Sequence, residues 1–156
     1  MSSSSDIPGV LAPPPLIFLS FVLLASALEK LWPQPTGLAP GALQALAAVL
    51  ASAGLSLALG ALGWFRKRGT DPRPWKPAEA LVVEGPYRWT RNPMYLAMTL
   101  LFLALGFWRN TCWHLALLPA LVEVMNRGVI RREERYLRRR FGQPYRRYLS
   151  QVRRWL

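Results

Sequence analysis

The stretch Gly41–Phe65, GALQALAAVLASAGLSLALGALGWF, runs for 25 residues without a charged side chain. A helix needs about 20 mainly apolar residues to cross the ~30 Å hydrocarbon core of a bilayer. This segment is therefore long enough to span a membrane with some tilt. It contains Gly54, Gly60 and Gly63, and small residues let helices approach closely. We therefore expect this helix to lie in the centre of a helical bundle.

Charged residues are concentrated away from this segment. The chain has 156 residues, 52% of them hydrophobic, with 20 Lys and Arg against 8 Asp and Glu. Residues 7–65 hold only Glu29 and Lys30 as charges, whereas residues 127–156 hold eleven arginines and two glutamates. Apolar blocks beside a cationic block are typical of an integral membrane protein facing an anionic leaflet. A soluble nucleic-acid-binding protein would also be basic, but it would not need such a long uncharged run.

Further apolar segments predict an all-α membrane bundle of about four spans in a single domain, residues 1–156. The spans are residues 16–32, 41–65, 94–108 and 112–130. No Lys or Arg precedes the first span, so we expect a retained helix rather than a cleaved signal peptide. The last two spans are short and separated by Arg109-Asn110. We expect them to form a helical hairpin whose second helix runs on into the polar C-terminal region.

The distribution of Lys and Arg predicts the orientation in the membrane. Residues 66–91 hold seven cations and residues 131–156 hold ten, whereas residues 33–40 hold none. Cytoplasmic loops carry the excess of Lys and Arg. The loop 66–93 and the tail 131–156 are therefore expected on the cytoplasmic side. Four spans then place both termini there, in an integral protein of the bacterial inner membrane.

The tail predicts two amphipathic helices. Gly142 is expected to end the first helix, and Pro144 to begin the second. The apolar residues of the second helix recur at helical spacing, at Tyr145, Tyr148, Leu149, Val152, Trp155 and Leu156. With its basic opposite face, this helix suits a position on the membrane surface.

The residues exclude several kinds of site. Cys112 and His114 are each the sole residue of their type, so an internal disulfide, a cysteine zinc site and a multi-histidine metal site are all excluded. No phosphate-binding glycine loop is present. The polar residues instead form two clusters, EGPYRWTRNPMY at 84–95 and RREER at 131–135. They flank the hairpin, so we expect them to meet at its cytoplasmic mouth.

Two longer motifs contain these clusters, LVVEGPYRWTRNPMYLAMTLL and REERYLRRRFGQPYRRYLSQVRRW. They resemble the isoprenylcysteine carboxyl methyltransferase family, in a superfamily that includes phospholipid methyltransferases. The resemblance covers the second half of the chain. It implies S-adenosylmethionine as methyl donor and a lipophilic acceptor, such as an isoprenoid-cysteine-like carboxylate or a lipid amine. The family's cofactor contacts would fall on Glu79, Ala80, Leu81, Val82, Tyr87, Asn92, Pro93, Met94, Tyr95 and Glu133, with Glu134 as the alternative to Glu133.

The resemblance gives these residues positioning roles, with no covalent nucleophile, and Arg91, Asn92 and Glu133 are the candidate catalytic residues. Arg88 or Arg91 can pair with the donor's carboxylate, and Tyr87 and Tyr95 can offer ring faces to its sulfonium.

The chain departs from the family at two positions. Many members carry histidine where this chain has Asn92, which cannot take up a proton near neutral pH. Eukaryotic members carry an arginine at the position of Val129. Arg127 or Arg131 is the candidate substitute on the substrate side.

Simpler interpretations remain open beside these roles. The arginines can be membrane-surface cations, the tyrosines interfacial aromatics, and Glu133 a partner of neighbouring arginines. Glu123, inside an apolar run, precedes Arg127 by four residues, which favours a structural ion pair. The alternative function is a small four-helix transporter or a scaffold that binds anionic lipid. The expected partners are membrane lipids and a lipophilic substrate, not nucleic acid.

Overall fold

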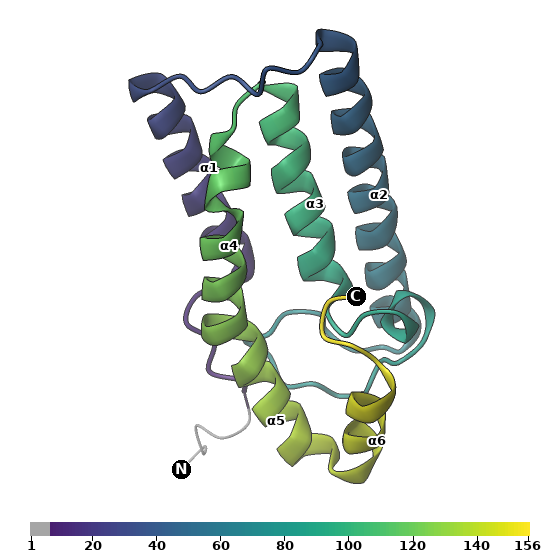
Figure 1. Ribbon diagram of the computed structural model, residues 1–156. Helices are drawn as coiled ribbons and strands as arrows, with labels where there is room; N and C mark the ends of the chain where they lie inside the picture. Colours follow the sequence, from purple (N-terminus) through teal and green to yellow (C-terminus); the bar gives the residue numbers. More distant parts are fainter. Residues whose placement is uncertain (1–6) are drawn as a thin grey trace.

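The structure is a computed structural model and describes residues 7–156. Within these residues the regular secondary structure is entirely helical, without a strand, which confirms the all-α class. The elements in chain order are α1 (Pro14–Leu31), α2 (Pro40–Lys67), the 3₁₀ turn η1 (Gly85–Arg88), α3 (Pro93–Trp108), α4 (Trp113–Met125), the π-helical turn η2 (Asn126–Ile130), α5 (Arg131–Phe141) and α6 (Gln143–Gln151). Helices α1 to α4 form the body of the bundle, and α5, α6 and the long loop 68–92 gather at one end (Figure 1).

Two helices, α1 and α2, are long and apolar enough to cross a membrane, and α3 is a shorter apolar helix. Each of the three begins with a proline in its first turn. Proline suits this position because the first N–H groups of a helix have no partner within the helix. Most side chains of α1 and α2 are not buried within the protein, as expected for helices surrounded by lipid. The architecture is a membrane helical bundle.

The central helix is α3, so the expectation that α2 is central is wrong. Helix α3 packs against α2 on one side and against α1 and α4 on the other, and α2 lies at the edge of the bundle (Figure 1). Gly54 does permit the close approach expected of a small residue. A Cβ there would lie 3.0 Å from the carbonyl oxygen of Ala97. Small residues are buried on α3 as well, at Ala97, Ala104 and Gly106.

Helix α4 continues through η2 into α5 without a break, as the sequence predicts. The π-helical turn contains Gly128, whose carbonyl accepts a hydrogen bond of 2.9 Å from the N–H of Leu11. A Cβ on Gly128 would lie 3.2 Å from the Leu11 side chain. The segment before α1 therefore packs directly against this turn.

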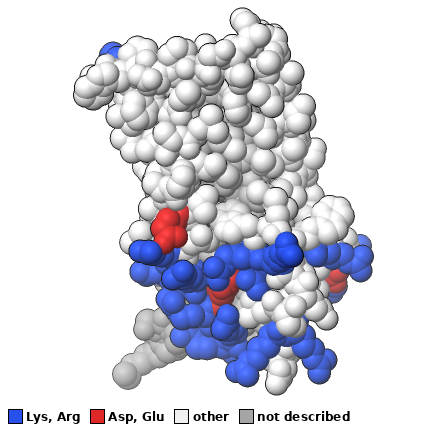
Figure 2. Space-filling model, in the orientation of Figure 1, with Lys and Arg blue, Asp and Glu red and all other residues white. Residues whose placement is uncertain are grey.

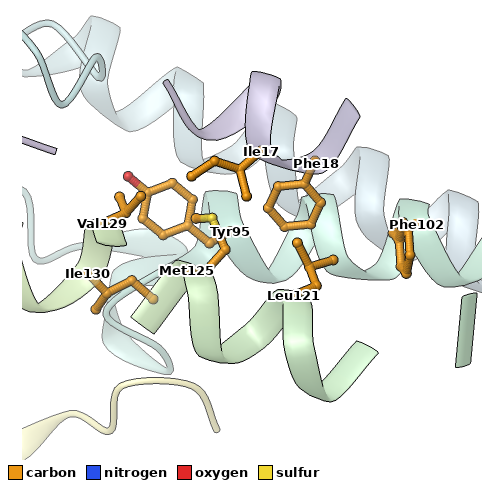
Figure 3. Close-up of a cluster of buried hydrophobic side chains, with 8 residues drawn as sticks. All are labelled: Ile17, Phe18, Tyr95, Phe102, Leu121, Met125, Val129 and Ile130. Carbon is orange, nitrogen blue, oxygen red and sulfur yellow. The ribbon is translucent and has the colours of Figure 1, made fainter. Parts of the chain in front are cut away.

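The largest core lies between α1, α3, α4 and the π-helical turn (Figure 3). Its buried side chains are Ile17, Phe18, Tyr95, Phe102, Leu121, Met125, Val129 and Ile130. Tyr95 and Ile130 lie toward the polar end of this cluster and link the apolar bundle to the site described below.

At the opposite end, the loop 32–39 is tied to the α3–α4 turn. The N–H of Cys112 donates to the carbonyl of Gln34 at 2.8 Å, and the Thr36 hydroxyl donates to Oδ1 of Asn110 at 2.8 Å. His114 is buried beneath Gly106. Within residues 7–156, Cys112 and His114 belong to no cluster that could hold a metal ion.

Nearly all the Lys and Arg side chains visible in Figure 2 gather at the end formed by α5, α6 and the loop 68–92, below a mostly white body of uncharged residues. The two cationic segments, residues 66–91 and 131–156, therefore share one end of the bundle, as predicted. The side of the membrane that this end faces stays a prediction, and Met1–Asp6 lie outside the described residues.

The tail agrees with the sequence up to Gln151 and differs beyond it. Gly142 adopts a positive φ of 56° between α5 and α6, and α6 carries a proline in its first turn. The helix ends at Gln151, and Val152 is extended, with φ −123° and ψ 134°. Tyr145 and Tyr148 are buried inside the protein. The expectation that this helix continues to Leu156 with its apolar face on the membrane is wrong, because these rings pack beneath the loop 84–92.

Candidate functional site

A cavity of about 120 Å³ lies at the polar end of the bundle. Its walls come from the loop 71–82, the start of α3, the start of α5 and helix α6. The sequence-predicted residues among its lining are Ala80, Leu81, Val82, Tyr87, Arg91, Asn92, Met94, Tyr95, Glu133 and Glu134. The two motifs that flank the hairpin thus meet at one site, as predicted.

Glu133 and Tyr95 form the contact between α5 and α3 at this cavity. The Tyr95 hydroxyl donates to Oε2 of Glu133 at 2.8 Å. Glu133 has no Lys or Arg within ion-pair distance among residues 7–156. Burial raises the pKa of Glu133 from 4.5 to about 7, the hydrogen bond from Tyr95 opposes this shift, and the charge of Glu134 adds to it. Glu133 can therefore change protonation state near neutral pH.

Glu134 lies in the opposite environment, between two arginines. Its carboxylate accepts two hydrogen bonds from Arg154, at 2.9 and 2.8 Å, and one from Arg91 at 3.0 Å. The side chains of Glu134 and Arg91 are only 8% and 12% exposed. Charge-assisted hydrogen bonds of this kind are strong. Because these bonds pair its charge, Glu134 acts as a clamp between α5 and the start of α3, whereas Glu133 has no such cationic partner among residues 7–156.

Aromatic rings form one wall of the cavity. Tyr87 is buried and meets the ring of Phe65 edge to face, with 5.6 Å between ring centroids. Its carbonyl accepts a hydrogen bond of 2.7 Å from the hydroxyl of Tyr148, whose ring centroid lies 6.0 Å from that of Tyr145. Burial, with the charge of Glu133, raises the pKa of Tyr87 well above 10. The phenol is therefore neutral at physiological pH and offers an uncharged ring.

The loop that closes the other side is held by a few specific bonds. The Tyr136 hydroxyl accepts from the N–H of Ala78 at 2.9 Å, and the Thr70 hydroxyl accepts from the N–H of Glu79 at 3.1 Å. Gly85 turns the chain back with φ +61°, and a Cβ there would overlap the indole of Trp64. The segment 80–82 is thereby held along the cavity.

Comparison with known proteins identifies the family. A sequence model described as phospholipid methyltransferase matches residues 38–144, from before α2 to the start of α6. The chain belongs to the phospholipid methyltransferase family. This confirms the superfamily indicated by the motifs, and membership in a methyltransferase family indicates methyl transfer with lipid-type substrates.

A relative in Haemophilus influenzae is 41% identical to this phospholipid methyltransferase family member over 63 residues. The matched region is 40% of this chain and 100% of the relative, which is described as an uncharacterized protein. No solved structure matches the chain.

Several predicted residues of this family member lie away from the cavity. The Glu79 side chain is exposed and borders a neighbouring open hollow, and Pro93 is buried at the start of α3 without lining the cavity. Arg88 and Arg131 are exposed. Arg127 is 72% exposed and pairs with Glu123 at 2.5 Å. The predicted Glu123–Arg127 ion pair is confirmed, and it lies outside the cavity.

The sequence did not reveal Phe65, Tyr136, Tyr145, Tyr148 and Arg154 as parts of the site. The spacing of the tail tyrosines showed an apolar face, but nothing in that pattern distinguished a face buried in protein from one buried in lipid. Arg154 is one of many tail arginines, and its partner is 20 residues away.

Proposed function

We propose that this protein transfers a methyl group from S-adenosylmethionine to a lipophilic acceptor at the cytoplasmic face of the membrane. The observation that carries the proposal is the environment of Glu133. Its carboxylate lies in an aromatic-lined cavity at the polar end of the bundle, bonded to the Tyr95 hydroxyl and without a cationic partner among residues 7–156. A partly buried carboxylate without a cation suits a ligand that supplies hydroxyl groups or positive charge.

The residues around the cavity fit the chemical groups of this donor. Glu133 can accept hydrogen bonds from the ribose hydroxyls or the ammonium group. The rings of Tyr87 and Tyr95 can face the sulfonium, a contact worth about 0.5–2 kcal/mol each. The segment 80–82 can offer main-chain groups to the edge of the adenine ring. When bound, the donor supplies an activated methyl group.

The size of the cavity implies that it widens on binding. Ligand pockets typically enclose roughly 300–1,000 Å³, whereas this cavity holds about 120 Å³. The loop residues 71–78 form one wall, and most of the loop's described hydrogen bonds are formed near its ends. We therefore expect this loop to move outward when the donor enters.

The protein's own contribution is mainly positioning. Well-held reactants can lower a barrier by about 7–11 kcal/mol. Asn92 cannot take up a proton, so the role of the histidine found there in other members is not available to this chain. Glu133 is the cavity group whose carboxylate can hold a proton near neutral pH.

The apolar side of the cavity supports a lipophilic acceptor. Tyr95 and Ile130 belong both to the cavity wall and to the core between α1, α3 and α4. An acceptor with an apolar tail can thus lie against the bundle while its reactive group reaches the polar end. Both a carboxylate oxygen and an amine nitrogen remain candidates for the methylated atom.

Calorimetric titration of the detergent-solubilised protein with S-adenosylhomocysteine tests the proposal. We expect saturable binding by the wild type and weaker binding by Glu133→Gln and Tyr95→Phe. Glu123→Gln is the matched control, because that carboxylate is 46% exposed and lies outside the cavity. Absence of wild-type binding at high micromolar ligand would contradict the proposal. Equal affinity in all four proteins would show that the donor binds elsewhere.

A further inference from the structure

After α6, the residues Val152–Leu156 cross the start of α3, and we call this segment the strap. Three consecutive residues of the loop hold its main chain. The N–H of Arg91 donates to the Arg153 carbonyl at 3.0 Å. The Thr90 hydroxyl and Nδ2 of Asn92 both donate to the Arg154 carbonyl, at 3.1 and 2.9 Å.

The strap is also held by a charged side chain. The Arg154 guanidinium forms a two-bond fork with the Glu134 carboxylate, which also accepts from Arg91. Planar arginine–carboxylate forks fix orientation as well as distance. Arg154 therefore binds the loop residues Thr90 and Asn92 through its carbonyl, and it binds Glu134 of α5 through its side chain.

A third contact anchors the end of the strap at the π-helical turn. Nε1 of Trp155 donates to Oδ1 of Asn126 at 3.1 Å, and the indole packs against the core between α1, α3 and α4. The strap thus joins the start of α3 to the turn that precedes Glu133 and Glu134.

We propose that Arg154 is a positioning residue for the candidate site. Arg154 itself does not line the cavity. It bonds directly to Asn92 and Glu134, and Glu134 in turn bonds to Arg91. All three of these residues line the cavity. The inference rests on the proposed function, and it concerns how the site is assembled rather than which donor binds.

The bonds of the strap determine what the cavity residues can offer. The amide nitrogen of Asn92 is occupied by the Arg154 carbonyl, which leaves the amide oxygen as an acceptor. Arg91 is occupied by Glu134 and by the Leu149 carbonyl, at 3.2 Å. These bonds use its two terminal nitrogens, whereas its buried Nε has no hydrogen-bond partner among residues 7–156 and could donate to a donor carboxylate. Loss of Arg154 would leave Glu134 held by Arg91 alone among the described residues, so the geometry of this pair would be less fixed.

Two measurements on the full-length protein test this inference. The first is hydrogen–deuterium exchange of the Arg91 amide, which reports the strap without any ligand. The second is the affinity for S-adenosylhomocysteine. The variants are Arg154→Ala and Arg154→Lys, with Arg153→Ala as matched control because the Arg153 side chain is exposed.

We expect Arg154→Ala to expose the Arg91 amide to faster exchange and to weaken binding about tenfold, the scale of losing one charge-assisted hydrogen bond. Arg154→Lys keeps the charge but not the fork, so exchange and affinity should fall between those of the wild type and Arg154→Ala. Arg153→Ala should match the wild type in both measurements.

The inference is overturned if the Arg91 amide stays protected in both Arg154 variants, or if Arg153→Ala changes both measurements as much as Arg154→Ala does. It is also overturned if exchange of the Arg91 amide accelerates in Arg154→Ala while the affinity for S-adenosylhomocysteine stays unchanged, because Arg154 would then have a structural role only. Failure of the wild type to bind the ligand, with exchange responding as expected, would instead reject the proposed function.

Discussion

The hydroxyl of Tyr95 lies 2.8 Å from Oε2 of Glu133, and this bond joins the third residue of α3 to the third residue of α5. It bridges 38 residues of sequence across the mouth of the helical hairpin. The next residue, Glu134, makes its bonds to Arg91 and Arg154 instead. Two adjacent carboxylates thus have different partners, a tyrosine hydroxyl for Glu133 and two arginines for Glu134.

Replacement of each carboxylate by its amide should separate these roles. Glu134→Gln leaves two arginines without their anion, and breaking a buried pair in this way should lower the free energy of unfolding by roughly 3 kcal/mol. Glu133→Gln removes a partly buried charge that has no cation among residues 7–156, so stability should be unchanged or higher. Thermal unfolding in detergent measures both variants. Equal destabilisation of the two would contradict the assigned environments.

Stability should depend on pH through Glu133. Its pKa is raised from 4.5 to about 7 in the folded state, so between these values the folded protein binds more protons than the unfolded chain. Stability then falls as pH rises through this window. Melting curves between pH 5 and pH 8 measure the slope, and Glu133→Gln should flatten it. A slope identical in wild type and variant would contradict the prediction.

Binding of S-adenosylhomocysteine should respond to the same group in the opposite direction. If the carboxylate form of Glu133 accepts the ligand's hydroxyl or ammonium protons, affinity should rise as pH increases through about 7. Titrations at pH 6 and pH 8 on the wild type and on Glu133→Gln measure the difference. The variant is expected to bind more weakly and with little dependence on pH. If its affinity still rises with pH, another group causes the pH dependence.

Gly85→Ala and Gly63→Ala form a matched pair. Alanine at position 85 would need a positive φ and would overlap the indole of Trp64, so the loop before η1 should be displaced and stability lowered. Position 63 is inside α2 with no atom within 4 Å of the added Cβ. Alanine there should be neutral or stabilise by roughly 0.5–1 kcal/mol. Thermal unfolding compares them, and equal effects would contradict the role given to Gly85.

Reporter fusions should place the cationic end in the cytoplasm. A fluorescent or phosphatase reporter after Leu156 is expected to give the cytoplasmic signal, and a reporter inserted in the loop 32–39 the opposite one, because that loop contains no Lys or Arg. A periplasmic signal after Leu156 would reverse the predicted orientation.

The sequence predicted the elements governed by local patterns. Uncharged runs and prolines located α1, α2 and α3, and Gly142 separated α5 from α6. The meeting of the two polar clusters followed from hairpin geometry, because the start of one helix and the end of the next must be neighbours. The different partners of Glu133 and Glu134 could not be predicted, because Arg154 comes from a segment whose path no local pattern specified.

The two incorrect expectations, for the tail helix and for the position of α2, arose because a local pattern does not specify what a helix face packs against. The tyrosines of α6 show the same periodicity whether they are buried in lipid or in protein. Similarly, the glycines of α2 permit close packing without specifying how many neighbours will pack there. The Arg127–Glu123 ion pair, in contrast, was predictable, because both partners lie one turn apart on the same helix.

The strap has a consequence for biosynthesis. Translation is vectorial, and Arg154 leaves the ribosome after the loop, both hairpin helices and Glu134 have been made. Until it emerges, Arg91 is the one ion-pair partner that Glu134 has among residues 7–156, and Asn92 and Thr90 lack their carbonyl acceptor. The nascent chain can thus enter the membrane before its site is complete, and a product that terminates prematurely before Arg154 should be inserted but should bind S-adenosylhomocysteine more weakly than the full-length protein.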